Sequence, residues 1–116
     1  MKKVIQFHLN TDDAGEVTNK DELNLYEHAI VNIKGQTDIS MHIGYVCQIG
    51  NIDNGQFYIM ENAEREDGFD INLIIFSDEK EFIETAKEMT HYGSNRNFRL
   101  RIFSNYVSEE ALAKYI

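Results

Sequence analysis

Apolar and polar residues alternate along the start of the chain, which is the pattern of a β-strand with one buried face. Ile5, Phe7 and Leu9 recur at every second position and predict a strand over 4–9. Acidic residues, Asn and Gly are frequent in the next segment, 10–22, which predicts a polar loop.

The segment 23–34 fits either a helix or a strand. Its second half alternates Ala29, Val31 and Ile33, which favours a strand there. The polar residues of 34–38 surround a glycine and predict a turn before the next strand.

A longer alternating run predicts a strand over 39–49, and the pair Asn54-Gly55 follows it closely. Asn-Gly is a strong hairpin signal because both residues tolerate a positive φ. We therefore expect a hairpin whose returning strand covers 56–62, followed by a charged turn over 63–68.

The predicted strand 69–76 ends in four apolar residues, which favours a central strand covered on both faces. Asp78 can cap a helix over 78–92, and Gly93 can end that helix in the left-handed conformation. The apolar stripe of the helix consists of Phe82, Ile83, Ala86 and Met89.

Alternation returns over 97–104 and predicts a further strand, after which Ser108 can cap a short helix over 108–114. Hairpin-linked strands with few helices predict the α+β class. We expect a mainly antiparallel sheet of about five or six strands, with the main helix (about 78–92) and the short C-terminal helix packed on one face. The length of 116 residues and the absence of proline predict a single compact domain, 1–116.

The chain is acidic, with 20 Asp and Glu against 11 Lys and Arg and a formal net charge of −9. Nucleic acids and anionic membranes are bound mainly through cations, so we expect neither as a direct partner. No apolar stretch approaches the ~18 residues of a membrane span. Cys47 is the only cysteine, which excludes an internal disulfide and favours a cytoplasmic location.

The sequence contains no phosphate-binding glycine loop, no zinc-ligand spacing and no nucleophile elbow. We therefore expect no catalytic residue, metal or cofactor. His8 and His42 could face each other across neighbouring strands, but the preferred interpretation is that each bonds a neighbour on the sheet. Cys47 has no nearby Lys or Arg to lower its pKa, so we expect a buried, unreactive thiol. His91 is expected to favour the C-terminal end of the main helix.

The cationic patch of the chain lies on the predicted strand 97–104 and the residue before it. Its members are Arg96, Arg99 and Arg101. We expect them to pair with neighbouring acids rather than to bind an anion.

Acidic residues concentrate in 61–91, where Glu81, Glu84 and Glu88 form a row on the helix opposite its apolar stripe. Such a surface can simply keep the protein soluble. It can also attract a basic partner, because rows of carboxylates imitate a phosphate backbone. The candidate partner-binding residues are Glu64, Glu66, Asp67, Asp70, Glu81, Glu84 and Glu88.

These features predict a non-enzymatic acidic protein that inhibits or neutralises a basic protein. Its target would be a nuclease toxin, as for an immunity protein, or a nucleic-acid-binding defence complex, as for a phage inhibitor that mimics DNA. Two alternatives stay open. One is a structural or regulatory module that assembles with itself through an exposed sheet edge, and the other is a small ligand- or metal-binding enzyme domain that uses His8 and His42. The sequence does not fix the oligomeric state.

Overall fold

The computed structural model describes residues 2–89 and 95–116, and its strands form one antiparallel five-stranded sheet. The sheet order is β1-β5-β4-β3-β2, so β1 and β2 are its two edges. The strands are β1 (Lys2–Asn10), β2 (Ile33–His42), β3 (Tyr45–Ile52), β4 (Phe57–Arg65) and β5 (Gly68–Phe76). The helices are α1 (Lys20–Ile30), α2 (Glu79–Met89), α3 (Arg96–Phe103) and α4 (Glu109–Tyr115). This arrangement confirms the predicted α+β class.

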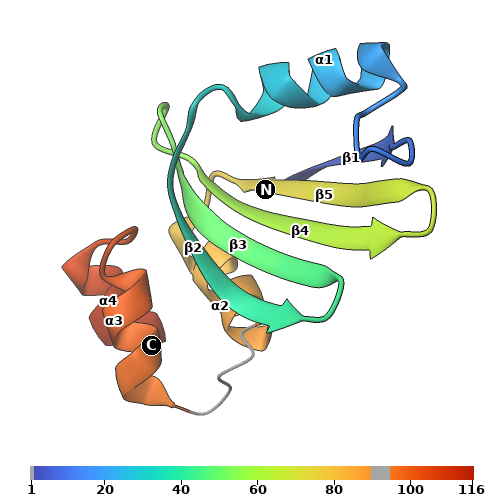
Figure 1. Cartoon of the computed structure of the whole chain (residues 1–116). Helices are drawn as coiled ribbons and strands as arrows, with labels where there is room; N and C mark the ends of the chain where they lie inside the picture. Colours follow the sequence, from blue (N-terminus) through green and yellow to red (C-terminus); the bar gives the residue numbers. More distant parts are fainter. Residues whose placement is uncertain (1, 90–94) are drawn as a thin grey trace.

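Helices cover both faces of the sheet (Figure 1). The α2 helix lies against one face with α3 and α4 beside it, as expected for the main and terminal helices. The α1 helix covers the opposite face and was not predicted. None of the helices in 2–89 and 95–116 is long and apolar enough to cross a membrane.

The sheet separates two apolar clusters because successive side chains of a strand point to opposite faces. Ile59 and Phe76 point toward α2, whereas Tyr58 and Leu73 point toward α1. All four side chains are fully buried. This confirms the expectation that strand 69–76 is central and covered on both faces.

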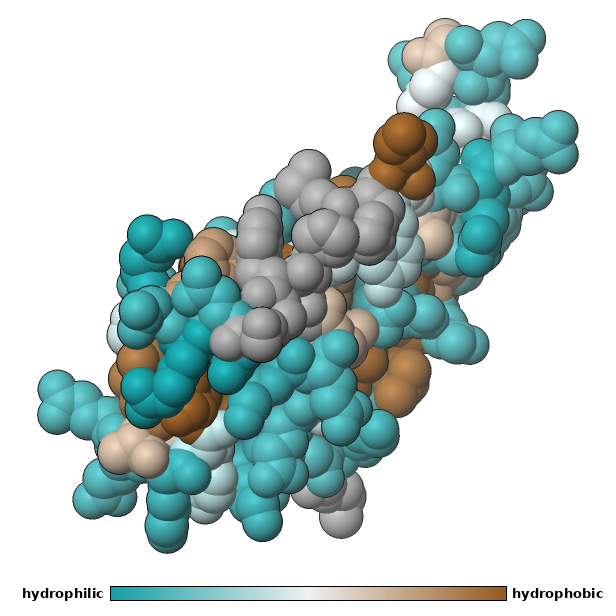
Figure 2. Space-filling model, turned by 90° about the horizontal axis from the view of Figure 1, so that it is seen from below, coloured by the Kyte–Doolittle hydropathy of each residue, from teal (hydrophilic) through white to brown (hydrophobic). Residues whose placement is uncertain are grey.

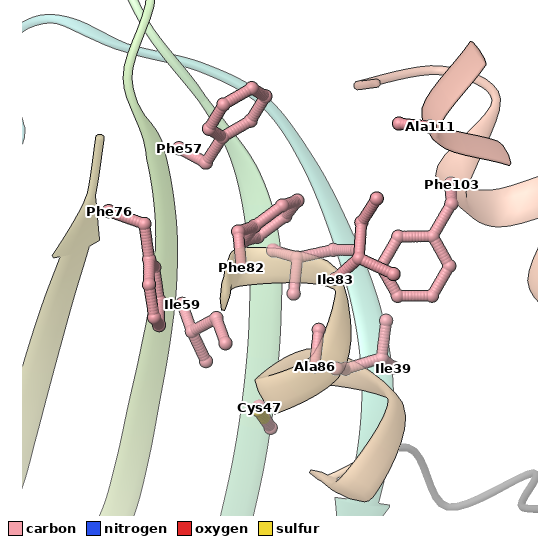
Figure 3. Close-up of a cluster of buried hydrophobic side chains, with 11 residues drawn as sticks. Ile39, Cys47, Phe57, Ile59, Phe76, Phe82, Ile83, Ala86, Phe103 and Ala111 are labelled. Carbon is pink, nitrogen blue, oxygen red and sulfur yellow. The ribbon is translucent and has the colours of Figure 1, made fainter. Parts of the chain in front are cut away.

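Phe82 of α2 is the centre of the cluster on the α2 face (Figure 3). Its ring stacks on Phe57 at a centroid distance of 4.9 Å and meets the edge of Phe103 of α3 at 6.2 Å. Phe76 of β5 lies 5.8 Å away. One aromatic side chain therefore links the sheet to two helices, and removing it would leave a large cavity.

A loop was predicted over 10–22 and a strand for the second half of 23–34. Both predictions were wrong for the residues that form α1, Lys20–Ile30. The residues that α1 packs against the sheet recur at helical spacing. They are Leu23, Tyr26, Ala29 and Ile30. The alternation that favoured a strand covered only three positions, and the longer helical period prevails because it fits a face of the sheet that needs cover.

The predicted turn over 34–38 and the single strand over 39–49 were also wrong. β2 continues through 34–38 with two register shifts against β3. The chain instead reverses at Ile43 and Gly44, where Gly44 has φ 77°. Apolar residues stay in phase across this tight reversal, so the period of two gave no sign of it.

The hairpin at Asn54-Gly55 is confirmed, since β3 and β4 pair as neighbours and Gly55 has φ 84°. The strand predicted over 97–104 is wrong, because this segment forms α3. The side chain of Asn95 accepts a hydrogen bond from the Phe98 amide and caps the helix. Ser108 caps α4 as predicted, by accepting from the Ala111 amide. The predicted end of the main helix, with His91 and Gly93, lies outside the described residues.

Candidate functional site

Polar side chains replace apolar ones on the α2 face of the sheet at the end where β4 meets β5. Along β5 the same phase that places Phe76 in the core places Asp70 at this end, and β4 likewise runs from Phe57 to Arg65. Together they surround a concavity of about 500 Å³. We call it the polar hollow. It is lined by Gln6, Phe7, His8, Glu22, Tyr45, Glu61, Ala63, Arg65, Asp70 and Asn72.

The shape of the polar hollow follows from the strand register. His8 on β1 stands opposite Asp70, Asp70 opposite Ala63, and Ala63 opposite Tyr45. Ala63 is the small side chain in this row, so the longer side chains on either side of it enclose a depression. The next row toward the core runs from Gln6 through Asn72 and Glu61 to the buried Cys47.

Asp70 is held by a histidine and an arginine on one wall of the polar hollow. His8 Nδ1 lies 2.5 Å from Asp70 Oδ1, and Arg65 Nε donates to Asp70 Oδ2 at 2.7 Å. The hydrogen bond from Arg65, and then that from His8, lowers the pKa of Asp70. The hydrogen bond to Asp70 raises the pKa of His8, and the charge of Asp67, whose Oδ1 lies 3.4 Å from His8 Nε2, adds to this.

Tyr45 and Glu61 form the opposite wall. The Tyr45 hydroxyl donates to Glu61 Oε2 at 2.8 Å. Burial, and then this hydrogen bond, raises the pKa of Tyr45, so the phenol stays protonated. Burial raises the pKa of the Cys47 thiol to about 12, with a contribution from the Glu61 charge. Cys47 is therefore the buried, unreactive thiol that the sequence predicted.

The charges in and beside the polar hollow are mainly negative. Its carboxylates belong to Glu22, Glu61, Asp67 and Asp70, and its cations to His8 and Arg65. The balance stays negative even when His8 is protonated. Within residues 2–89 and 95–116, no group of three or more His, Cys, Asp or Glu is arranged to hold a metal ion. The carboxylates of the polar hollow suit the binding of an ammonium or guanidinium group.

The alternative in which His8 and His42 face each other across neighbouring strands is wrong. His8 lies on β1 and His42 on β2, which are opposite edges of the sheet. His8 instead bonds a neighbouring acid on a partly exposed sheet face, as the preferred interpretation of this residue expected. Strand order does not follow from local sequence pattern, so the separation of these histidines could not be deduced in advance.

The predicted acidic residues of β4 and β5 divide between the two faces of the sheet. Asp70 lines the polar hollow, and Glu66 and Asp67 form the exposed turn beside it. Glu64 alternates with Ala63 and Arg65, so its side chain lies on the other face. Its backbone amide donates to the Gly44 carbonyl at 2.6 Å, in the neighbouring turn.

The three predicted acids of α2 do not form a uniform exposed row. Glu84 and Glu88 are exposed and line a shallow concavity together with Lys87 and Arg99. Glu81 is half-buried, and its Oε1 is inaccessible to solvent. The cations beside Glu84 and Glu88 offset the negative charge there.

The three arginines predicted as one strand patch lie on α3, where they have different surroundings. Arg96 Nε donates to the Ile116 carbonyl at 3.2 Å, and the Arg101 guanidinium lies 5.4 Å from the centre of the Phe98 ring. Arg99 shares the concavity of the α2 acids. A helical segment turns its residues in several directions, so the patch expected from strand alternation does not form.

Sequence reasoning missed Tyr45, Glu61 and Asn72 as parts of one site. A signal was present, because Glu61 and Asn72 are polar residues in the phase that is otherwise buried against α2. A polar residue in a core phase indicates a place where cover ends or a ligand enters. No family model, curated protein or solved structure matches this chain.

Proposed function

We propose that this protein is a non-enzymatic binding protein that neutralises a basic protein target, with the polar hollow and the adjacent β4–β5 turn as its docking surface. The observation that carries the proposal is a concave, net-negative sheet face built on four neighbouring strands. Strands hold their side chains in place, so the surface loses little freedom when a partner binds.

A basic side chain of the partner fits the chemistry of the hollow. Its guanidinium or ammonium group would meet the Glu61 carboxylate, with the Tyr45 ring beside it. Asp67 and Glu66 at the rim would meet further cations of the partner. The net charge of −9 would steer a positively charged protein toward this surface.

The class of partner is inferred from the kinds of protein that have a basic surface. Nucleases and nucleic-acid-binding complexes have one because they bind phosphates. An acidic protein seated on that surface competes with the nucleic acid. We therefore propose an inhibitor of the immunity-protein or phage-inhibitor type that acts in the cytoplasm. Hydrophilic residues dominate the side of the molecule seen in Figure 2.

The geometry favours the polar hollow over the α2 acids as the main docking surface. Glu84 and Glu88 lie beside Lys87 and Arg99, and the Glu81 carboxylate is partly buried. The rim acids Glu66 and Asp67 are exposed at a turn.

Two charge-reversed double variants of equal net charge test this choice. E66K/D67K reverses the rim of the hollow, and E84K/E88K reverses the helix. The probes are a purified cationic nuclease and an arginine-rich peptide, and association is measured at low salt. We expect E66K/D67K to slow association about tenfold or more, and E84K/E88K to have a much smaller effect. Equal losses would show that only the net charge matters, and failure of the unmodified protein to bind either probe would overturn the proposed function.

A further inference from the structure

The outer edge of β1 is occupied along only half of its length. In the occupied half, the Asn19 side chain donates to the His8 carbonyl at 2.8 Å and accepts from the Asn10 amide at 2.9 Å. The Asn10 carbonyl accepts from the Thr18 amide at 2.8 Å, and Glu22 lies 3.4 Å from the His8 amide. These contacts show that the backbone groups of His8 and Asn10 point away from β5.

The other half of this edge is open. Because backbone groups alternate along a strand, those of Lys2, Val4 and Gln6 also point away from β5. Nothing in residues 2–89 and 95–116 is found bonded to these outward groups. An open, regular edge is a template for another strand.

The opposite edge of the sheet is protected. β2 has two register shifts, and Tyr106 lies against it, with its hydroxyl hydrogen-bonded to Thr37 and its ring beside Gly35. Irregular backbone hinders the addition of a strand. The two edges therefore differ, and β1 is the one prepared to pair.

We propose that the open half of β1 pairs antiparallel with the same segment of a second copy, which joins two sheets into one. The symmetric register places Val4 opposite Val4 of the partner, and Lys2 opposite Gln6. Each copy then satisfies all the outward groups of these three residues. A register shifted by one residue pair would bring Lys2 to His8, whose outward groups already have partners.

Exposed apolar side chains lie beside this axis on both faces. Val4 is 51% exposed on the α2 face and would meet its own copy. On the α1 face, Leu25 is 61% exposed and lines a largely apolar groove of about 450 Å³ with Ile5. The pairing would cover these surfaces, which are costly to leave in water.

The charges of the edge are also complementary. Lys3 of one copy would stand opposite Ile5 of the other, at the mouth of this groove. Its aliphatic stem can cover the apolar groove while its ammonium group reaches toward Glu22, which lines the same groove. This complementarity selects a second copy as the occupant, because both the cation and the carboxylate belong to this chain.

The dimer is tested by sedimentation over a range of protein concentrations. We expect a concentration-dependent dimer that is lost in V4K, because two ammonium groups would then face each other on the axis. V31K is the matched control, since Val31 is also exposed, at 68%, and lies after α1, away from the edge. A monomer at all concentrations overturns the proposal, as does equal loss in both variants. Binding of an unrelated strand peptide by a protein that stays monomeric would assign the edge to another occupant and would also overturn it.

Disulfide trapping tests the register. Opposite residues in such a pair lie about 5.5 Å apart between Cα atoms, which suits a disulfide. We expect V4C to cross-link with itself, whereas K2C should cross-link with Q6C and not with itself. Cys47 is fully buried and does not compete. Self-cross-linking of K2C at the efficiency of the mixed pair would overturn the symmetric register.

Discussion

His8 is a titratable group whose charge should change the stability of the fold. Its pKa is raised by Asp70, and the pKa of Asp70 is lowered by Arg65 and His8. The pair is therefore fully charged between the ordinary pKa values of 3.8 for Asp and 6.5 for His. The stability that His8 contributes is complete below pH 6.5 and is lost as the pH rises through its raised pKa. The contribution of Asp70 is lost as the pH falls through its lowered pKa.

We predict that H8Q removes the part of this stability that depends on the imidazolium. The difference in the free energy of unfolding between the unmodified protein and H8Q should be larger at pH 5 than at pH 8, as measured by urea unfolding. H28Q is the matched control, because His28 lies on the exposed surface of α1. A difference that is equal at both pH values would show that His8 contributes through packing alone.

Gly50 is required by the close approach of two strands. A Cβ atom there would lie 1.9 Å from the Gly35 carbonyl oxygen and 2.8 Å from that of Lys34. Backbone atoms of β2 cannot move away without breaking the sheet. We predict that G50A lowers the free energy of unfolding by about 3 kcal/mol.

G55A provides the comparison for this substitution in denaturant unfolding. A Cβ atom at position 55 would meet no other atom within 4 Å, so the only cost of the substitution is the strain of its left-handed φ of 84°. We expect this variant to lose about 1 kcal/mol. A smaller loss in G50A than in G55A would mean that the bulge of β2 rearranges easily.

The α1 helix is fastened to the sheet by Asn19. This residue is at the N-cap position, yet its side chain bonds β1 in place of the helix. We predict that N19A lowers the free energy of unfolding by about 1–2 kcal/mol. Hydrogen exchange should show faster exchange in α1 and at the Asn10 amide, while α2 is unchanged.

Two variants sharpen this test. N19D keeps the acceptor for the Asn10 amide but loses the donor to the His8 carbonyl, so its stability should fall between those of the unmodified protein and N19A. N24A changes an exposed asparagine of the same helix and should be neutral. If N19A also leaves exchange in α1 unchanged, the apolar contacts of α1 hold it without Asn19.

The elements that local pattern predicted correctly are those whose signal is long or chemically specific. The hairpin at Asn54-Gly55 has a turn type that few residues can adopt, and strand 69–76 and the helix after Asp78 have long apolar patterns. The failures share a cause. At 29–33 a few alternating residues imitated a strand where α1 ends and β2 begins, and at 97–104 they imitated one within α3. Tertiary packing decided the outcome in both places.

The candidate site was predictable only in part. Asp67 and Asp70 were identified as acids, but their grouping with His8, Tyr45 and Glu61 depends on the register of three strand pairs. One of these pairs, β1 with β5, joins His8 to Asp70 across 62 positions of sequence. Register and strand order arise from long-range pairing, which local alternation does not encode. For the same reason, the sequence did not indicate which of the acids lie at the polar hollow and which lie on α2.

Because the whole chain is negatively charged, added salt should affect folding stability and partner binding in opposite directions. A net charge of −9 repels itself in the compact state, so screening by salt should stabilise the fold. Attraction to a basic partner is screened by the same ions, since the Debye length falls from about 30 Å at 0.01 M to about 10 Å at 0.1 M. We predict that added NaCl raises the Tm by a few degrees while it slows association with a cationic nuclease.

Both quantities are measured on the same samples, with V4K as a further background in which pairing through β1 does not contribute. E66K/D67K should show a weaker salt dependence of association than E84K/E88K, because fewer carboxylates then remain at the docking surface. Association that is independent of salt would mean that apolar contacts recognise the partner. That result would contradict an electrostatic role for the polar hollow even if binding itself were observed.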